Sequence, residues 1–248
     1  MSTTEKTIVI TRFDPDKDET PYQQEYQVPC EPSWKVLDAI NFIKDELDAT
    51  VSHRWSCRMA VCGSCGMMVN GEPKLTCKVA LSDYGDVVEV EPLANFPIIR
   101  DLVVELEGFM ERFKKVKPWI IRAKERAVEE GTFRQSPQEL ADFKQFSMCI
   151  NCMLCYSACP VVGNEPHFLG PAAIALGHRY NLDTRDEGAS ERNRVFLEEG
   201  GVFSCSYANE CSEVCPKSVD PAAAVQQSKA LSLVDWAKGL VLPRGGGE

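Results

Sequence analysis

The sequence lacks the long apolar run that a membrane-spanning helix needs. No uninterrupted apolar stretch in its 248 residues approaches the roughly 18 residues of such a helix. The sequence also has no excess of positive charge, because 27 Lys and Arg residues face 37 Asp and Glu residues and the formal net charge is -10. Nucleic-acid binders normally carry a basic excess, so this balance argues against that class. The polar N-terminus has no apolar core of a secretory signal, which predicts a soluble chain in a reducing compartment.

Histidine is scarce in this sequence, with three residues, whereas cysteine is abundant, with twelve. The histidines lack the spacing of Rieske cluster ligands, and we expect three structural or exposed side chains: His53, His167 and His178. Twelve cysteines would indicate disulfides in a small secreted protein, but in a reducing compartment they indicate metal binding. Eleven of them fall into three blocks, over residues 57–77, 149–159 and 205–215.

The N-terminal part predicts several strands around one helix. Alternating apolar residues and turn signals predict five strands: Thr7–Phe13, Gln23–Val28, Met67–Val69, Lys74–Val79 and Val87–Val90. Asn70-Gly71 is a typical hairpin turn between the third and fourth of these strands. The apolar positions from Ser33 to Leu47 recur at helical spacing, so this segment predicts a helix capped by Ser33.

From Leu93 onward the pattern changes to short helices and connecting segments. Asp101–Val116 carries a helical apolar pattern, and the polar stretch Arg122–Arg134 resembles a connector. Ser136, followed by a proline and then by Glu139, predicts the start of another helix through a capping box. Two further helices are predicted between or after the cysteine blocks: Pro171–Asn181 and Asp220–Lys238.

The first block holds four cysteines with the spacing C-x4-C-x2-C-x11-C: Cys57, Cys62, Cys65 and Cys77. This is the plant-type ferredoxin spacing, which binds a [2Fe–2S] cluster through four thiolates. Gly63 and Gly66 inside the loop let the backbone bend tightly and aim amide N–H groups at the sulfurs. A structural zinc site is the alternative, although zinc ribbons usually pair two C-x2-C knuckles and this block has one.

The second and third blocks repeat one pattern. The second is a bacterial ferredoxin run, C-x2-C-x2-C-x3-C-P, formed by Cys149, Cys152, Cys155 and Cys159. In two-cluster ferredoxins the fourth cysteine of such a run ligates the other cluster, so a partner run is expected. The third block is that partner, C-x5-C-x3-C-P, formed by Cys205, Cys211 and Cys215. Its position equivalent to Cys152 is Ala208.

Exchange of the fourth ligands assigns each set of cysteines to a cluster. Four thiolates are predicted to hold a [4Fe–4S] cluster: Cys149, Cys152, Cys155 and Cys215. Three remain for the other site, where we expect a [3Fe–4S] cluster: Cys159, Cys205 and Cys211. Alanine cannot bind iron at position 208, but a labile [4Fe–4S] cluster with water or another side chain on its fourth iron stays open. Cys30 lies outside every block, and we expect an ordinary half-buried thiol.

These patterns together predict an α+β protein with two ferredoxin domains. Residues 1–105 form a β-grasp, plant-type [2Fe–2S] ferredoxin domain, and residues 106–135 a connector. Residues 136–248 form an all-α, bacterial-type ferredoxin domain with the [4Fe–4S] and [3Fe–4S] clusters.

Over nearly its whole length, the chain resembles the iron–sulfur subunit of succinate dehydrogenases and fumarate reductases. The order of the three cysteine blocks carries the resemblance, together with four landmark segments: Trp55–Met59, Leu93–Pro97, Gly170–Ala173 and Cys211–Pro216. The resemblance implies a subunit of a succinate:quinone oxidoreductase that has no catalytic residues of its own. It relays electrons one at a time between the FAD of a flavoprotein and a quinone, through the three clusters.

The same resemblance implies partners and a location. We expect an FAD-containing flavoprotein subunit facing the N-terminal domain, and one or two hydrophobic membrane-anchor subunits facing the C-terminal domain. The chain would then be peripheral, at the cytoplasmic face of the cell membrane. Many succinate dehydrogenases carry a tryptophan shortly after the Cys-Pro of the second block. Here Val161–Asn164 has none, which favours the fumarate-reductase-like branch and menaquinone.

The resemblance also suggests three residues of a quinone pocket. Ser206 follows a residue expected to bind the [3Fe–4S] cluster, and Gln226 and Lys229 match polar positions that line the pocket in fumarate reductases. The resemblance implies that the ammonium group of Lys229 donates a hydrogen bond to a quinone carbonyl. A solvated polar face on the last helix is the alternative interpretation of these residues.

Two other functions stay open on the sequence alone. One is an iron–sulfur subunit of a different flavoenzyme, such as a thiol-linked fumarate reductase or a heterodisulfide-reductase-like system. Those proteins usually carry further cysteine-rich repeats, and none follows Cys215. The other is a zinc-binding adaptor without redox function, which would contain no acid-labile sulfide. The three clusters, in contrast, require about nine irons and ten sulfides per chain.

Overall fold

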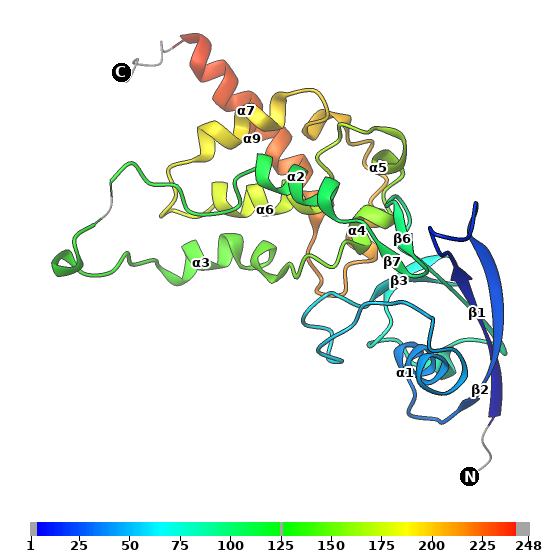
Figure 1. Ribbon diagram of the computed structural model, residues 1–248. Helices are drawn as coiled ribbons and strands as arrows, with labels where there is room; N and C mark the ends of the chain where they lie inside the picture. Colours follow the sequence, from blue (N-terminus) through cyan, green and yellow to red (C-terminus); the bar gives the residue numbers. More distant parts are fainter. Residues whose placement is uncertain (1–3, 125, 242–248) are drawn as a thin grey trace. The chain divides into compact units, whose positions relative to one another are not determined.

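The computed structural model describes residues 4–124 and 126–241, and the chain divides into two compact units. The first unit contains Met1–Glu107 together with Ile150–Ala158. The second contains Gly108–Cys149 and Cys159–Glu248. Both are drawn in Figure 1 with colours that follow the sequence. The short segment 150–158, which carries two cysteines of the second block, therefore packs with the N-terminal unit.

A mixed five-stranded sheet forms the centre of the first unit. Its strand order is β2-β1-β5-β3-β4, where the strands are β1 (Thr4–Arg12), β2 (Tyr22–Cys30), β3 (Gly66–Val69), β4 (Glu72–Leu75) and β5 (Val87–Glu91). Strand β1 pairs antiparallel with β2 and parallel with β5. Figure 1 shows the helix α1 (Val36–Phe42) beside this sheet. A helix laid across a mixed sheet is the β-grasp arrangement that the sequence predicts.

Apolar side chains from the sheet and α1 make the core of the first unit. Side chains two residues apart on a strand point to the same face, so Ile8 and Ile10 of β1 share one face of their strand, as do Val88 and Val90 of β5. Six fully buried members are Ile8, Ile10, Val36, Ile40, Val88 and Val90. Each such side chain contributes about 1.5–3 kcal/mol relative to an exposed one, which holds the helix against the sheet.

The helix expected from Ser33 to Leu47 starts later and changes geometry before it ends. Helix α1 begins at Val36, because Asp38 accepts a hydrogen bond at its Oδ2 from the N–H of Lys35, at 2.9 Å, and caps the first turn. From Ile43 to Leu47 the backbone forms a π-helical turn, η1, so that Asp48 N bonds to Ile43 O at 2.7 Å. The expected cap at Ser33 is therefore wrong.

The helix expected over Asp101–Val116 is wrong in its first half. A short hairpin stands there, formed by β6 (Ile98–Arg100) and β7 (Val103–Val104), and α2 (Glu107–Lys115) begins only after it. Asp101 occupies the turn with a φ of 46°. Its Oδ1 accepts a hydrogen bond from Arg12 Nε at 3.0 Å, in a buried ion pair. This long-range pair fixes the turn and overrides the local helical pattern.

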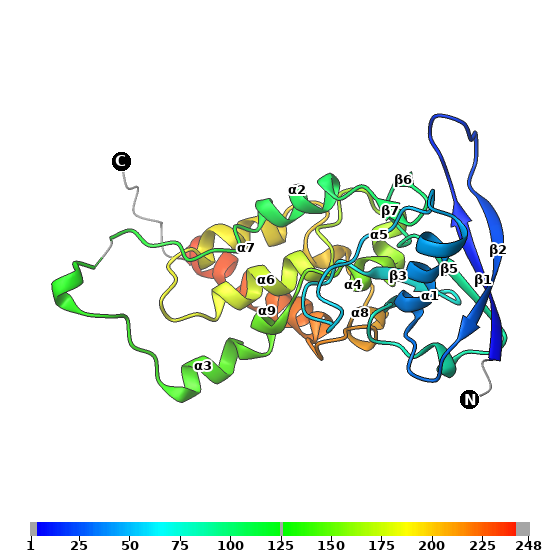
Figure 2. The ribbon, with the colours of Figure 1, turned by 60° about the horizontal axis from the view of Figure 1, so that its bottom comes forward.

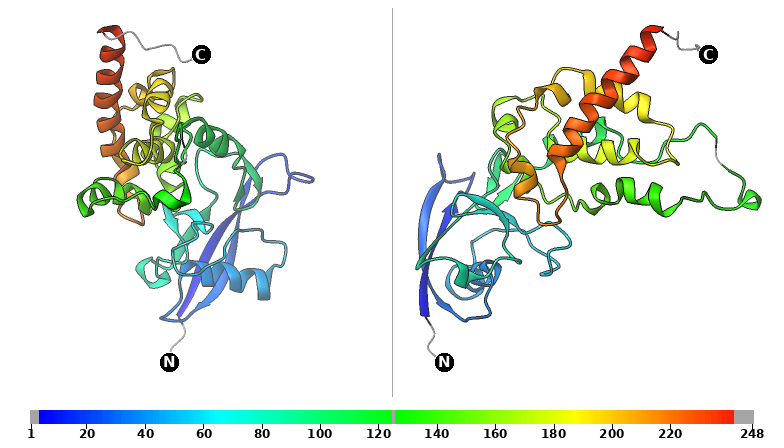
Figure 3. Two further views of the ribbon diagram at one scale, coloured as in Figure 1. Left: turned by 90° about the vertical axis from the view of Figure 1, so that its left-hand side faces the viewer. Right: turned by 180° about the vertical axis from the view of Figure 1, so that it is seen from behind.

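The second unit is helical. Its main helices are α3 (Pro137–Lys144), α5 (Pro160–Asn164), α6 (Pro171–Asn181), α7 (Ala189–Leu197), α8 (Glu210–Glu213) and α9 (Pro221–Val241). The capping box predicted at the start of α3 is confirmed, because Glu139 N donates to Ser136 Oγ at 3.2 Å and Ser136 N donates to Glu139 Oε2 at 2.6 Å. Helix α9 packs against α6 and α7. Figure 2 shows α6 and α7 close to α9, and the right-hand view of Figure 3 shows α9, in orange and red, from behind the view of Figure 1.

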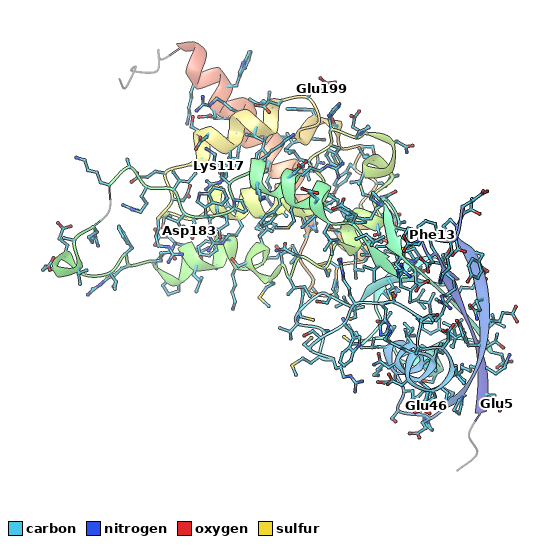
Figure 4. The ribbon with its side chains drawn as sticks, in the orientation of Figure 1. Glu5, Phe13, Glu46, Lys117, Asp183 and Glu199 are labelled. Carbon is cyan, nitrogen blue, oxygen red and sulfur yellow. The ribbon has the colours of Figure 1, made fainter. Side chains whose placement is uncertain are left out.

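A buried ion pair ties the segment after α2 to this helical unit. Arg192 in α7 pairs with Asp186 at 2.6 Å, and both side chains are buried. The same guanidinium donates to the carbonyl oxygens of Lys117 and Trp119 at 3.0 and 2.7 Å. Lys117 is labelled in Figure 4. The pair thus fixes a stretch of irregular chain that has no regular backbone ladder of its own.

Within residues 4–124 and 126–241, no helix combines the length and apolarity needed to cross a bilayer.

Candidate metal centres

None of the twelve cysteines, which all lie within the described ranges, is part of a disulfide bond. Five block cysteines are buried, with exposed fractions of 2–9%: Cys65, Cys77, Cys152, Cys159 and Cys211. Cys30 is not half-buried as expected but 4% exposed, because it ends β2 on the same inward face as Tyr26 and Val28. Cysteine sulfurs are thus available to bind metal in every block. No group of three or more His, Cys, Asp or Glu side chains in the described ranges stands ready to hold a single metal ion.

The first cysteine loop directs backbone N–H groups at one sulfur. Cys57 Sγ accepts hydrogen bonds from the N–H groups of Met59, Val61 and Cys62, at 3.4, 3.4 and 3.3 Å. These bonds lower the pKa of the Cys57 thiol to about 6, because they stabilise the thiolate. The loop is thereby prepared for negative charge on sulfur, which the ligands of an iron–sulfur cluster carry.

The loop owes this geometry to left-handed backbone at non-glycine residues. Arg58 and Ala60 have φ values of 56° and 55°. This conformation costs about 1–2 kcal/mol per residue, and such strain is typically retained at functional sites. The Arg58 guanidinium lies 4.7 Å from the ring centroid of Trp55, which helps to hold the strained turn.

The other two cysteines of the first block lie on its buried side. Burial raises the pKa of the Cys65 thiol to about 11, since the thiolate would lose its water. Thr76 holds this side of the loop, because its N–H and its hydroxyl both donate to the Cys65 carbonyl oxygen, at 3.1 and 3.0 Å. The block therefore has a more accessible half, with Cys57 half-buried and Cys62 exposed, and a buried half with Cys65 and Cys77.

The second and third blocks share one backbone conformation. Each begins with a 3-10 turn, η4 (Phe146–Met148) or η5 (Val202–Ser204), and later contains one turn of helix, α4 (Leu154–Ser157) or α8 (Glu210–Glu213). Two left-handed residues precede that helix in each block: Asn151 and Met153, or Tyr207 and Asn209. Every one of these features recurs at a spacing of 56 residues, as from 149 to 205. The same spacing takes Cys152 to Ala208, so the backbone supports the sequence equivalence of these two positions.

A cavity in the second unit brings together the three cysteines expected for the [3Fe–4S] cluster. Cys159, Cys205 and Cys211 line it, and Ala208 lines it with them. Burial raises the pKa of the Cys211 thiol to about 12, and the charges of Cys159 and Cys205 act in the same direction. Burial likewise raises the pKa of the Cys159 thiol. Three sulfurs and a methyl group around one cavity fit a cluster that lacks its fourth iron.

The cysteines expected for the [4Fe–4S] cluster come from both units. Cys149 and Cys215 belong to the second unit, where they pack against a buried cluster that includes Phe146 and Val219. Cys215 Sγ accepts a hydrogen bond from Val219 N at 3.3 Å. Cys152 and Cys155 belong to the first unit.

Of the three residues expected at the quinone pocket, Ser206 and Lys229 lie beside Cys205 of the third cysteine block. Ser206 is exposed and lines the cavity of Cys205. Lys229 Nζ donates to the carbonyl oxygen of Cys205 at 3.1 Å. Gln226 Nε2, one helical turn away, is buried and has no hydrogen-bond partner in the part of the chain that the structure describes. Tyr207, which also lines the cavity and is 57% exposed, is absent from the sequence prediction, since no spacing rule singles out a tyrosine there.

The histidines occupy structural or exposed positions, as the sequence predicts. His178 is fully buried between hydrogen bonds to Gln227 Oε1 at 2.8 Å and Ser228 Oγ at 3.1 Å. His53 bonds to Asn41 Oδ1 at 2.8 Å, and burial lowers its pKa to about 4. His167 is exposed.

Comparison with known proteins assigns both halves of the chain. Residues 7–111 match the family described as a 2Fe-2S iron-sulfur cluster binding domain, and residues 145–219 match the 4Fe-4S dicluster domain. The fumarate reductase iron-sulfur subunit of Mycobacterium tuberculosis is 54% identical over 96% of this chain and 97% of its own length. The succinate dehydrogenase iron-sulfur subunit of Coxiella burnetii is 36% identical over 94% of this chain and 99% of its own length.

A solved structure has a similar fold. A chain of the Mycobacterium smegmatis Sdh1 complex in the apo form superposes with a TM-score of 0.79 at 27% identity. The superposition covers 94% of this chain and 97% of that one.

Proposed function

The chain belongs to the family of fumarate reductase and succinate dehydrogenase iron–sulfur subunits, and we propose that it relays electrons between a flavoprotein FAD and a membrane quinone. It is an electron-transfer subunit of an oxidoreductase complex, with a 2Fe–2S domain and a 4Fe–4S dicluster domain. The proposal adds a third cluster, [3Fe–4S], as the last carrier before the quinone. Bound clusters supply one-electron redox chemistry, which no side chain of the protein provides.

Eleven cysteines are proposed as the ligands. Cys57, Cys62, Cys65 and Cys77 would hold [2Fe–2S]; Cys149, Cys152, Cys155 and Cys215 would hold [4Fe–4S]; and Cys159, Cys205 and Cys211 would hold [3Fe–4S]. The observation that carries the assignment is the cavity lined by three cysteines and Ala208. The repeated backbone of the second and third blocks supports the equivalence of this alanine with Cys152.

The chain's own residues would tune the sites in two ways. In the first block, three backbone N–H groups donate to Cys57 Sγ and offset negative charge there. Around Cys159 and Cys211, burial excludes water and disfavours added charge. Hydrogen bonds to sulfur and solvent exposure are the main influences of a protein on cluster potential, so the two environments favour different potentials.

A quinone site beside the third block is part of the proposal. Ser206, Gln226 and Lys229 would offer it a hydroxyl, an amide and an ammonium group. The unpaired, buried Gln226 Nε2 supports this role, since a buried polar atom without a partner is costly unless a ligand satisfies it. The fumarate-reductase-like sequence after Cys159 favours menaquinone as the occupant.

The proposed partners follow from the family. The relatives are named as subunits of fumarate reductase or succinate dehydrogenase, which supports assembly with other subunits. We propose an FAD-containing flavoprotein and one or two hydrophobic anchor subunits. In that assembly the chain would lie peripherally at the cytoplasmic face of the cell membrane.

Metal analysis joined to redox-poised paramagnetic resonance tests the proposal. The complex, purified anaerobically, should contain about nine irons and ten acid-labile sulfides per chain. Titration with succinate, fumarate and a menaquinol analogue should show three clusters with distinct signals. Zinc without acid-labile sulfide would contradict the proposal, and so would a stable four-iron cluster at Cys159, Cys205 and Cys211.

A further inference from the structure

Within the first unit, the first cysteine loop meets the segment 150–158 backbone to backbone. A methyl group added at Gly66 would lie 3.0 Å from the carbonyl oxygen of Cys152. One added at Gly63 would lie 2.9 Å from the carbonyl oxygen of Ile150 and 3.0 Å from Cys152 Cα. Contacts this short leave no room for a side chain, so the two glycines permit a closer approach than any other residue would.

The two glycines differ in why the site needs them. Gly63 has a φ of 75°, a conformation that other residues adopt only at a cost, so backbone shape alone would favour glycine there. Gly66 begins β3 with ordinary strand backbone, which any residue can adopt. At Gly66 the requirement is therefore space: its absent side chain leaves room for the Cys152 carbonyl oxygen.

Asn95 and Phe96 hold the C-terminal end of segment 150–158. Asn95 Nδ2 donates to the carbonyl oxygens of Tyr156 and Ser157, at 2.9 and 3.3 Å. The rings of Phe96 and Tyr156 lie 6.2 Å apart. These contacts belong to the helical turn α4 and lie away from the cysteine loop. They fix the position of Cys152 relative to the first block without touching a cysteine.

We propose that the contact of Gly63 and Gly66 with Cys152 is the route by which an electron passes between the first two clusters. This inference rests on the proposed function, since it takes Cys62 and Cys65 as ligands of one cluster and Cys152 as a ligand of the next. Electronic coupling falls steeply across non-bonded gaps and slowly along covalent bonds. A backbone-to-backbone contact adjacent to ligands on both sides therefore leaves a single short gap on the path.

The transfer is a one-electron exchange with no bond made or broken. The same electron would leave a reduced cluster held by the first block and would arrive at the cluster that Cys152 is proposed to ligate. The reduced flavin of the proposed partner supplies the electron, and a quinone finally accepts it; dithionite can replace the flavin in a test. Gly63 and Gly66 are positioning residues in this scheme, because neither binds iron.

Two glycine substitutions with matched controls test the route in the purified complex. Gly66→Ala adds one methyl group against Cys152, and Gly85→Ala adds one where no atom lies within 4 Å and φ is not positive. Gly63→Ala adds a methyl group and backbone strain, and Gly71→Ala adds the same kind of strain, at a φ of 78°, in open space. Comparison within each pair separates the effect of the added methyl group on the contact with segment 150–158 from its effect on the backbone at the substituted position.

The readouts are the rate of electron transfer between the two centres after rapid mixing, and the magnetic interaction between the two reduced centres. With all three clusters present by iron content and spectrum, Gly66→Ala should slow the transfer severalfold and weaken the magnetic interaction, while Gly85→Ala leaves both at wild-type values. Gly63→Ala should have the larger effect of the two loop variants. Equal behaviour of Gly66→Ala and Gly85→Ala would overturn the proposal.

A further variant keeps the proposal testable if a glycine variant loses one of its clusters. Asn95→Asp replaces a donor to two carbonyl oxygens with an acceptor that repels them, so the segment moves while the cysteine loop keeps its sequence. It should weaken the magnetic interaction as Gly66→Ala does, and an unchanged interaction would contradict the route. A wild-type complex without [2Fe–2S] or [4Fe–4S] signals would instead refute the proposed function, which distinguishes the two failures.

Discussion

Lys229 donates a hydrogen bond from its ammonium group to the carbonyl oxygen of Cys205, at 3.1 Å. A residue matched to the quinone pocket is thus attached to the backbone of a cysteine proposed to bind iron. The bond joins α9 to the third cysteine block inside one unit. Any movement of Lys229 toward a quinone carbonyl would lengthen or break its hydrogen bond to the loop that holds Cys205.

Replacement of Lys229 by methionine should impair this site while the chain still folds. A hydrogen bond from a charged group contributes about 1.5–3 kcal/mol, so the third block should lose stability and the last cluster should be released more easily. Quinol-dependent turnover and iron retention on mild oxidation measure the two effects. Lys238→Met on the exposed part of the same helix is the control. Identical behaviour of the two variants would show that Lys229 has no special role.

Replacement of Ala208 by cysteine should convert the proposed three-iron site into a four-iron site. The substitution completes the pattern of the second block and gives a fourth iron the thiolate it lacks. The iron content should rise by about one per chain, and the signal of the oxidised [3Fe–4S] cluster should disappear. Ala208→Ser, of similar size but without a thiolate, is the control. An unchanged iron content in Ala208→Cys would count against the exchange of fourth ligands.

Replacement of Arg192 by methionine should destabilise the second unit strongly. Asp186 would remain buried with an unpaired charge, which costs about 3–5 kcal/mol. The carbonyl oxygens of Lys117 and Trp119 would also lose their donor. Thermal unfolding measures the loss, and Arg194→Met on the exposed side of the same helix should change Tm little. The double variant with Asp186→Asn should recover part of the loss, because it removes the unpaired charge.

The half-buried His53 should make stability depend on pH. Burial and the charge of Lys44 lower the pKa of its imidazole from 6.5 to about 4 in the folded chain. Between these values the unfolded chain binds a proton that the folded chain does not, so stability falls as pH falls from about 6.5 toward 4. The full shift corresponds to at most about 3 kcal/mol, and partial exposure reduces it.

Unfolding of His53→Gln between pH 6.5 and 5 checks this dependence. The variant should lose stability less steeply than wild type as pH falls, while His167→Gln, changed at an exposed site, should keep the wild-type slope. Parallel slopes for all three proteins would show that His53 does not titrate between the two states.

Local signals in the sequence predict some regular elements and miss others. The strand expected over Lys74–Val79 is wrong beyond Leu75, because β4 spans Glu72–Leu75 and the chain then turns, with Lys78 N bonded to the Leu75 carbonyl oxygen at 2.8 Å. The helix expected over Pro171–Asn181 matches α6 in both bounds, because a proline at its first position and buried alanines define it locally. The hairpin and first turn at Asp101 could not be predicted, because they depend on Arg12, 89 residues earlier in the chain. The apolar pattern around Asp101 fits a helix equally well until that ion pair is known.

For the candidate cluster sites, too, local sequence signals could be interpreted in advance, whereas features that depend on tertiary contacts could not. The spacing of the cysteines predicts three sets of thiols, and the cavity in the second unit brings one set together. The left-handed backbone of loop residues such as Arg58 and Met153 could not be predicted, because neither is glycine and no local sequence signal favours a positive φ there. Nor could spacing reveal that the Cys152 carbonyl oxygen packs on Gly66, since that contact joins two blocks through tertiary structure.

The placement of 150–158 in the first unit has a consequence for synthesis of the protein on the ribosome. When residues 1–107 have emerged, the sheet and α1 can form, but Gly66 still lacks Cys152 and Leu154, which pack against it in the complete unit. The unit becomes complete only after the chain has grown past Ala158. Nascent domains usually fold in order from the N-terminus. Here closure of the first unit must wait for the start of the second cysteine block, because segment 150–158 belongs to that unit.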